Sequence, residues 1–206
     1  MIDGLRLSCS LWAVAHDDPL AHAKRLAKAG VKLWHWDHTD GVFAATGGFS
    51  ARDATAITQS VGGQAEAHLM MMSAKAEVDA WCDFCERVVI PIETTDCQTV
   101  LRHIERRGVQ PAVAVSPDTP LIGVSLSQEL PVLVMSVVPG QAGSPLLPST
   151  YQRLAAWPAA RTGYLGVDGG ITLAAIPGLR QAGATWLVVG SSLTGAPDAA
   201  QWLQAV

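Results

Sequence analysis

Short apolar runs alternate with longer amphipathic segments along the whole chain of 206 residues. The apolar runs are often rich in Val, Ile, Leu or Trp, which is typical of parallel strands that are buried on both faces. The pattern therefore predicts eight strands, over residues 5–11, 31–37, 64–69, 87–92, 112–116, 131–136, 163–168 and 185–190.

Each predicted strand is followed by a segment with a helical pattern. Ser50 is a residue type that favours an N-cap, and Gly30, Gly108 and Gly183 each follow a predicted helix just before the next strand, as helix-ending glycines do. The predicted helices cover residues 18–29, 50–61, 74–86, 96–107, 119–128, 149–157, 172–182 and 197–205.

Strict alternation of strand and helix indicates a parallel sheet with crossover helices. Eight such units favour an α/β fold of the closed (β/α)₈ TIM-barrel type, formed by one domain over residues 1–206. An open, doubly wound sheet stays the alternative if one unit has been misread, because periodicity alone does not distinguish the two.

The composition narrows the range of partners. The formal net charge is −4, and the 14 Lys and Arg residues are scattered along the chain, which argues against nucleic acid as a partner. The first residues lack the basic and apolar regions of a signal peptide. No apolar stretch approaches the ~20 residues that a membrane span needs. We therefore expect a cytoplasmic protein that does not bind membranes.

The four cysteines are expected to be reduced thiols in that location. Cys82 and Cys85 have CxxC spacing, but no second pair completes a zinc ribbon, and no active-site context indicates a redox role. An ordinary helical pair is the expected interpretation.

Polar residues gather where the predicted strands end, which is where catalytic groups lie in this type of barrel. His35 and Asp37 are two residues apart on one strand and so point to the same side, while His68 and Asp168 end two other strands. Two imidazoles and two carboxylates suit a first-row divalent ion such as Zn²⁺, Fe²⁺, Mn²⁺ or Co²⁺. From the residues alone, ordinary packing roles stay open for them.

The last two predicted strands end in glycine-rich loops, with Gly169 and Gly170 in one and Gly190 and Ser191 in the other. Glycine lets the backbone approach a ligand closely, and free N–H groups at a helix start favour an anion. These loops are the usual phosphate seat of the fold, although such sequences also form plain turns.

Motifs follow one another in a fixed order along the whole chain. They are Cys9-Ser10-Leu11, His35-Trp36-Asp37-His38-Thr39-Asp40-Gly41-Val42-Phe43, Ala67-His68-Leu69-Met70, Val134-Met135-Ser136-Val137-Val138-Pro139-Gly140, Val167-Asp168-Gly169-Gly170-Ile171 and Val189-Gly190-Ser191. In this order they resemble the ribulose-phosphate 3-epimerase family. Its corresponding motifs include Pro-Ser-Ile, His-x-Asp-x-Met-Asp-Gly-x-Phe, Asp-x-His-Leu-Met (here without the first Asp) and Met-Ser-Val-x-Pro-Gly.

The resemblance implies a metal-dependent epimerase, often a homo-oligomer, for a small phosphorylated ketose. Within the family, His35, Asp37, His68 and Asp168 would bind one divalent metal ion, and Asp37 and Asp168 would be the paired acid and base. Met70 and Met135 would pack beside the reacting carbons, and the glycines would hold the sugar phosphate. The implied substrate contacts are Ser10, His68, Met70, Met135, Gly140, Gln141, Ala142, Gly143, Gly169, Gly170, Gly190 and Ser191.

The implied reaction inverts carbon 3 of the ketose, with D-ribulose 5-phosphate and D-xylulose 5-phosphate as the expected pair. Asp37 and Asp168, from strands that we expect to flank the first strand, would remove a proton and return one on the opposite face. The intermediate is an enediolate, whose negative charge a metal ion would stabilise.

Four departures from the family pattern leave the sugar open, and two of them are the altered loop over residues 42–46 and Ser116 in place of Asn. Thr39 replaces a methionine, which predicts a more polar wall, and residues 140–144 lose an aromatic residue and a glycine. An epimerase for another ketose phosphate, such as allulose 6-phosphate, and a non-catalytic sugar-phosphate-binding barrel stay as alternatives. A related decarboxylase is disfavoured, because residues 37–40 lack the lysine of its Asp-x-Lys-x-x-Asp site.

Overall fold

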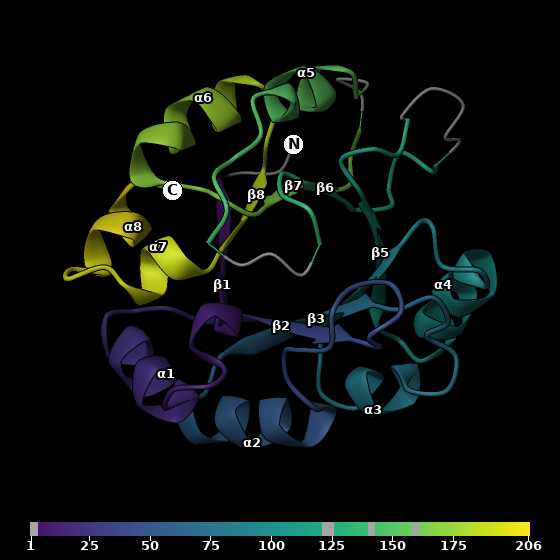
Figure 1. The fold of residues 1–206 in the computed structure, drawn as a ribbon, viewed down its shortest axis with the longest axis horizontal. Coiled ribbons are helices and arrows are strands. Elements are labelled where there is room, and N and C mark those ends of the chain that lie inside the picture. Colours follow the sequence, from purple (N-terminus) through teal and green to yellow (C-terminus); the bar gives the residue numbers. More distant parts are fainter. Residues whose placement is uncertain (1–3, 121–125, 140–142, 158–160) are drawn as a thin grey trace.

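Eight parallel strands form a closed barrel in the order β1 to β8, and β8 pairs with β1 (Figure 1). The computed structural model describes residues 4–120, 126–139, 143–157 and 161–206. The predicted TIM barrel is thus confirmed, with every predicted strand present. The strands are β1 (Arg6–Ser10), β2 (Leu33–Thr39), β3 (Gln64–Met70), β4 (Arg87–Pro91), β5 (Gln110–Val115), β6 (Val132–Met135), β7 (Leu165–Asp168) and β8 (Trp186–Val189).

Helices surround the barrel on its outside (Figure 1). The sequence signals explain the boundaries of the first two. The Asp18 carboxylate accepts a hydrogen bond of 2.9 Å from Ala21 N at the start of α1, and the Ser50 hydroxyl accepts one of 3.1 Å from Asp53 N in α2. The α-helices are α1 (Pro19–Lys28), α2 (Ala51–Val61), α3 (Val78–Cys82), α4 (Cys97–Arg106), α5 (Ser149–Ala155), α6 (Ile176–Gln181), α7 (Ser191–Thr194) and α8 (Ala200–Gln204), with 3₁₀ turns η1 (Trp12–Val14) and η2 (Leu173–Ala175).

The helix predicted over residues 119–128 is wrong at both of its described ends, which form turns and irregular backbone; residues 121–125 lie outside the described residues. The reason is a competing set of hydrogen bonds. The Arg153 guanidinium donates to the carbonyls of Pro117 and Thr119 at 2.8 and 3.0 Å, and the Thr119 hydroxyl donates to the Glu93 carboxylate. These contacts hold the segment after β5 as a loop against α5.

The helix predicted over residues 74–86 is also too long, because α3 covers only Val78–Cys82. On either side of α3, backbone bonds of three-residue spacing occur beside those of the α-helical pattern. Glu77 N donates to Ala74 O, and Phe84 N donates to Trp81 O. Such three-residue spacing is typical of turns and tight 3₁₀ ends.

Most of the hydrophobic core lies between the strands and the helices, and a smaller cluster around Leu133, Met135 and Trp186 fills the inside of the barrel. Cys82 and Cys85 belong to the outer core. Both are free thiols, and burial raises the pKa of Cys82 to about 11. A redox-active cysteine has a lowered pKa, so the structure agrees with the expected ordinary role of the pair.

No helix among the described residues combines the length and the apolar character that crossing a bilayer requires.

Candidate functional site

The longest continuous pairing in the barrel joins β2 and β3, which are matched over seven residue pairs from Leu33 and Gln64 to Thr39 and Met70. This register sets Asp37 beside His68. On the other side of the barrel, β6 and β7 pair Met135 with Asp168. Polar residues predicted at separate strand ends therefore arrive at one mouth of the barrel.

Four of these side chains form one cluster, His35, Asp37, His68 and Asp168, in which one ligand atom of each lies within 4.8 Å of the others. His35 Nε2 is 3.5 Å from Asp37 Oδ1, and His68 Nδ1 is 3.4 Å from Asp37 Oδ1 and 3.6 Å from Asp168 Oδ2. Two atoms that bind one tetrahedral ion at about 2.1 Å are about 3.4 Å apart. The cluster thus has the spacing of a ligand set.

Three of the four imidazole nitrogens in the cluster have no hydrogen-bond partner among the described residues. His35 Nε2 and both ring nitrogens of His68 are buried and make no hydrogen bond to the described residues. Buried polar atoms are normally paired, so these nitrogens fit a site in which an ion supplies the missing partner. The donor set of two nitrogens and two carboxylates suits a first-row divalent ion.

The charges in the cluster depend on one another. Burial disfavours the ionised form of Asp37, but the adjacent His35 and His68 outweigh this and hold the pKa of Asp37 below its usual range. Burial likewise opposes the charged form of both histidines, and the carboxylates around them outweigh it and raise the pKa of His35 and His68. The site is therefore arranged to keep the Asp37 carboxylate ionised.

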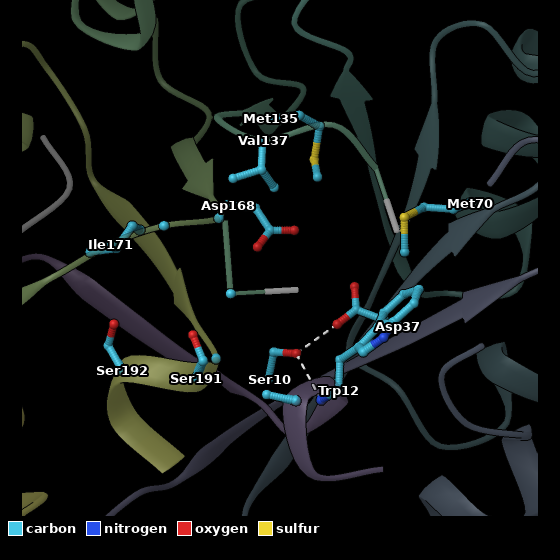
Figure 2. A pocket seen from close by; sticks show the side chains of 15 residues that line it. Ser10, Trp12, Asp37, Met70, Met135, Val137, Asp168, Ile171, Ser191 and Ser192 are labelled. Carbon is cyan, nitrogen blue, oxygen red and sulfur yellow. Dashed lines mark hydrogen bonds between the residues drawn. The ribbon is translucent and has the colours of Figure 1, made fainter. Parts of the chain in front are cut away.

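A pocket opens above the cluster, and Asp37 and Asp168 point into it from different directions (Figure 2). The Ser10 hydroxyl donates a hydrogen bond of 2.7 Å to Asp37 Oδ2. Because Asp37 Oδ1 faces the imidazoles, the two oxygens of this carboxylate have separate environments. The predicted residues that line the pocket are Ser10, Asp37, Met70, Met135, Gly143, Asp168, Gly169, Gly170, Gly190 and Ser191.

The remaining predicted residues divide into two groups. His35 and His68 are fully buried beneath the pocket rather than on its wall. Gly140, Gln141 and Ala142 lie outside the described residues, so their predicted contact with the substrate is not described by the structure.

The sequence analysis missed several lining residues, namely Trp12, Ala13, Val137, Ile171 and Ser192. The ring of Trp12 stands at the pocket beside Asp37 (Figure 2). Trp12 follows β1 directly, and its place at a strand end was the signal for it. Val137 and Ile171 stand within motifs that were already identified, and Ser192 adjoins one.

Two glycines shape the loop after β7. Gly169 and Gly170 have φ of +107° and +63°, a region that side chains with a Cβ rarely adopt. A Cβ at Gly170 would lie 2.2 Å from Leu146 N, and one at Gly169 would lie 2.4 Å from Val137 Cγ2. The Ser136 hydroxyl donates to Asp168 O at 2.7 Å. Glycine is thus required where this loop meets the segment after β6.

The loop after β2 is held by side chains from β2 itself. The Thr39 hydroxyl donates to Ala45 O at 2.8 Å and accepts from Gly47 N at 2.7 Å. Thr39 does not line the described pocket, so the expected polar wall at this position is wrong. His38 does not line the pocket, and its ring bonds to Phe49 O and to the Glu77 carboxylate, both at 2.9 Å.

One expectation about strand order is corrected. We expected the strands of Asp37 and Asp168 to flank β1, but the barrel closes through β8, which stands between β7 and β1. Two strands therefore separate the two aspartates.

Glu66 is a further buried acidic residue beside the cluster, and it was not predicted from the sequence. The segment Asp-x-His-Leu-Met has Glu66 at its first position, followed by Ala67 and His68. Glu66 is fully buried, and its Oε1 lies 2.8 Å from His35 Nδ1. The signal that could have identified it is an acidic residue two positions before His68, where the family motif has Asp.

The sequence comparisons with known proteins identify one family. Residues 6–194 match the Ribulose-phosphate 3 epimerase family. The chain is 34% identical to a ribulose-phosphate 3-epimerase from Chlamydia pneumoniae over 186 residues, which are 83% of this chain and 80% of the relative. It is 27% identical to the cytoplasmic isoform of this enzyme from Oryza sativa subsp. japonica, over 90% of this chain and 86% of the relative.

Solved structures show the same architecture. The barrel resembles 3-hexulose-6-phosphate synthase from Salmonella typhimurium with a TM-score of 0.70 at 17% identity, over 98% of this chain and 96% of that one. Thiamine phosphate pyrophosphorylase from Pyrococcus furiosus gives a TM-score of 0.58 at 11% identity, over 98% and 93% of the two chains. At these identities the likeness concerns the fold alone.

Proposed function

We propose a function on the premise that this chain belongs to the ribulose-phosphate 3-epimerase family. As a member of the family it is a carbohydrate epimerase that acts on a ketose phosphate. The proposed reaction inverts carbon 3 between D-ribulose 5-phosphate and D-xylulose 5-phosphate. The observation that carries the proposal is that the carboxylates of Asp37 and Asp168 enter one pocket from two separated strands.

The proposed acid and base are these two carboxylates. One removes the proton from carbon 3, and the other delivers a proton to the opposite face, so that the roles exchange with the direction of the reaction. The hydrogen bond from Ser10 keeps Asp37 Oδ2 at the pocket wall. Met70 and Met135 add apolar lining beside them, which supports exclusion of water from the reacting carbon.

We further propose that His35, Asp37, His68 and Asp168 hold one divalent ion, which is Zn²⁺, Fe²⁺, Mn²⁺ or Co²⁺. When bound, such an ion supplies Lewis-acid stabilisation of the negative charge that develops on the ketose oxygens. The ligand spacing and the unpartnered imidazole nitrogens support this assignment. Asp37 Oδ1 lies toward the imidazoles, which leaves Oδ2 for the substrate side.

The proposed phosphate seat consists of Gly143, Gly169, Gly170, Gly190 and Ser191 at the other end of the pocket. Their small size lets backbone N–H groups approach the anion. Binding energy from the phosphate would hold the reacting carbon in place between the two aspartates. The contacts predicted for Gly140, Gln141 and Ala142 stay predictions.

Solvent-deuterium exchange tests the proposal. Incubation of D-ribulose 5-phosphate with the protein in D₂O should place one deuterium on carbon 3 of the product, detected by mass spectrometry and proton NMR. Protein that binds the sugar phosphate without incorporating deuterium would contradict an enzymatic role. Turnover on a panel of phosphorylated pentuloses and hexuloses, allulose 6-phosphate included, decides the substrate.

Two further expectations stay predictions, the homo-oligomeric state and the cytoplasmic location. Light scattering on the purified protein checks the first, and fractionation of the source cells checks the second.

A further inference from the structure

We propose that Glu66 is a positioning residue that fixes the imidazole of His35, so that Nε2 faces the metal site before any ion arrives. The inference deepens the proposed metal-dependent function and rests on it. It is carried by a buried chain of contacts inside the barrel that runs from Arg87 through Glu66 to His35.

Both oxygens of the Glu66 carboxylate have partners on other strands. Oε1 lies 2.8 Å from His35 Nδ1 and accepts a bond of 3.1 Å from Trp186 Nε1, while Oε2 accepts a bond of 2.8 Å from the Arg87 guanidinium. Trp186 Nε1 also donates to the Ser8 hydroxyl at 2.8 Å. Side chains from β2, β4 and β8 thus hold this carboxylate in one place, and Ser8 on β1 holds the Trp186 ring nitrogen.

The guanidinium is fixed in turn. Arg87 Nε donates to Gln110 Oε1 at 2.9 Å, and the guanidinium carbon lies 4.5 Å from the ring centre of Trp186 and 4.9 Å from that of Tyr164. Arginine stacks well on aromatic faces. The positive charge therefore stays next to Glu66, which keeps the carboxylate ionised.

An ionised carboxylate only accepts hydrogen bonds, so the hydrogen of the contact belongs to His35 Nδ1. A neutral imidazole protonated at Nδ1 has its lone pair on Nε2, the atom that faces Asp37 Oδ1 at 3.5 Å. Carboxylates that accept from a metal-binding imidazole set its tautomer and ring orientation and raise its basicity.

Stability alone does not account for this arrangement. Glu66 is fully buried and Arg87 is 1% exposed, and a buried ion pair adds little stability compared with apolar side chains of the same volume. The pair lies directly beneath one candidate ligand and contacts it. His68 has no such support, since its Nε2 has no hydrogen-bond partner among the described residues.

The experiment must separate positioning from folding. Glu66→Gln alone would leave the buried Arg87 without its counterion and could unfold the protein. Two double variants avoid this. Glu66→Met/Arg87→Met removes the acceptor of His35, whereas Glu66→Gln/Arg87→Met removes the same charges but keeps a carbonyl oxygen that can accept from Nδ1. Asp79→Asn is the matched control, because Asp79 accepts from His103 at 2.7 Å on the exposed surface.

The readout is Co²⁺ affinity, measured by chelator competition and by the visible spectrum of the bound ion. Loss of such support typically lowers metal affinity by about 10–100-fold, so we expect a loss of that size in Glu66→Met/Arg87→Met. The Gln-containing variant should recover a large part of it, and Asp79→Asn should match the parent. Melting of the metal-free proteins checks that both double variants fold.

The outcomes distinguish the two proposals. If both folded double variants bind Co²⁺ as tightly as the parent, or both lose the same affinity, Glu66 does not position His35. If the parent protein itself binds no Co²⁺, the proposed metal-dependent function fails, and the role of Glu66 fails with it.

Discussion

The mouth of the barrel has two regions that are built in different ways. The region from β1 to β3 presents side chains, with Asp37 and two imidazoles on strands β2 and β3 of seven residues each. The region from β6 to β8 has strands of only four residues and presents glycine-rich loops. The first region suits a small ion, which needs a few fixed donor atoms, and the second suits an anion that the backbone can approach.

The two regions hold their polar groups in place by different means. Continuous pairing of β2 with β3, and the buried Glu66 beneath them, hold the donor atoms. In the second region the loop geometry depends on positive φ at Gly169 and Gly170 and on the absence of a Cβ there. Within the described part of the second region, Asp168 is the one candidate ligand that belongs to the cluster.

The largest effect is expected from Asp168→Asn, because Asp168 belongs both to the second region and to the His/Asp cluster. The amide cannot act as acid or base, so turnover should fall by at least the ~10²–10⁴-fold that positioned proton transfer contributes. The fold should be retained, because the Asp168 side chain is 15% exposed and lies at a strand end. Steady-state kinetics and circular dichroism measure the two effects. A variant that epimerises at the parent rate would break the two-aspartate scheme.

Removal of the metal should have the next largest effect. Protein purified without chelator should hold about one ion per chain, as elemental analysis can determine. Chelation should abolish turnover, and added divalent ion should restore it. An ion at about 100 times its Kd stabilises the fold by about 2.7 kcal/mol, so the melting temperature should fall on chelation. Full activity of a metal-free sample would contradict the role given to the first region.

A change in the second region should instead alter substrate affinity. Gly170→Ala introduces a Cβ that meets Leu146 N, at a φ of +63°. We expect KM for the sugar phosphate to rise about 10-fold, which corresponds to about 1.4 kcal/mol, while Co²⁺ affinity stays unchanged. Gly108→Ala is the control, since Gly108 has a φ of +74° and open space around it, away from the pocket. Equal KM values in the two variants would remove the distinction between the regions.

The smallest effect is expected when the native protein is treated with a thiol reagent. Its four cysteines are buried and all lie in the first half of the chain. Burial raises the pKa of Cys9 to about 12 and that of Cys97 to about 11. A raised thiol pKa means that the neutral form persists below it, so the native protein should react slowly with a disulfide reagent at pH 8. Unfolded protein should release four thiols. Fast reaction of the native protein would show that the first half opens readily.

The two regions also differ in how far the sequence predicts them. The eight strands could be predicted because each is a short apolar run. The four cluster residues could be predicted because they are metal-binding residue types in or at the end of such runs, namely His35, Asp37, His68 and Asp168. Glu66 was missed because one glutamate stands where the family motif has aspartate, and because its contacts to Arg87 and Trp186 join residues far apart in the sequence. The helix predicted over residues 119–128 was wrong because Arg153, more than 30 residues away, bonds to the carbonyls of Pro117 and Thr119 where that helix would begin.

Closure of the barrel by β1 and β8 has a consequence for protein synthesis. Trp186 on β8 donates a hydrogen bond to Glu66. Gly190, just after β8, lies so close to Ser10 that a Cβ added to it would be 3.7 Å from Ser10 Cβ. A nascent chain emerges from the ribosome with its amino-terminal half first, so every donor atom but that of Asp168 is exposed long before the last strand exists. We therefore expect catalytic competence to arise only when β8 closes the barrel against β1.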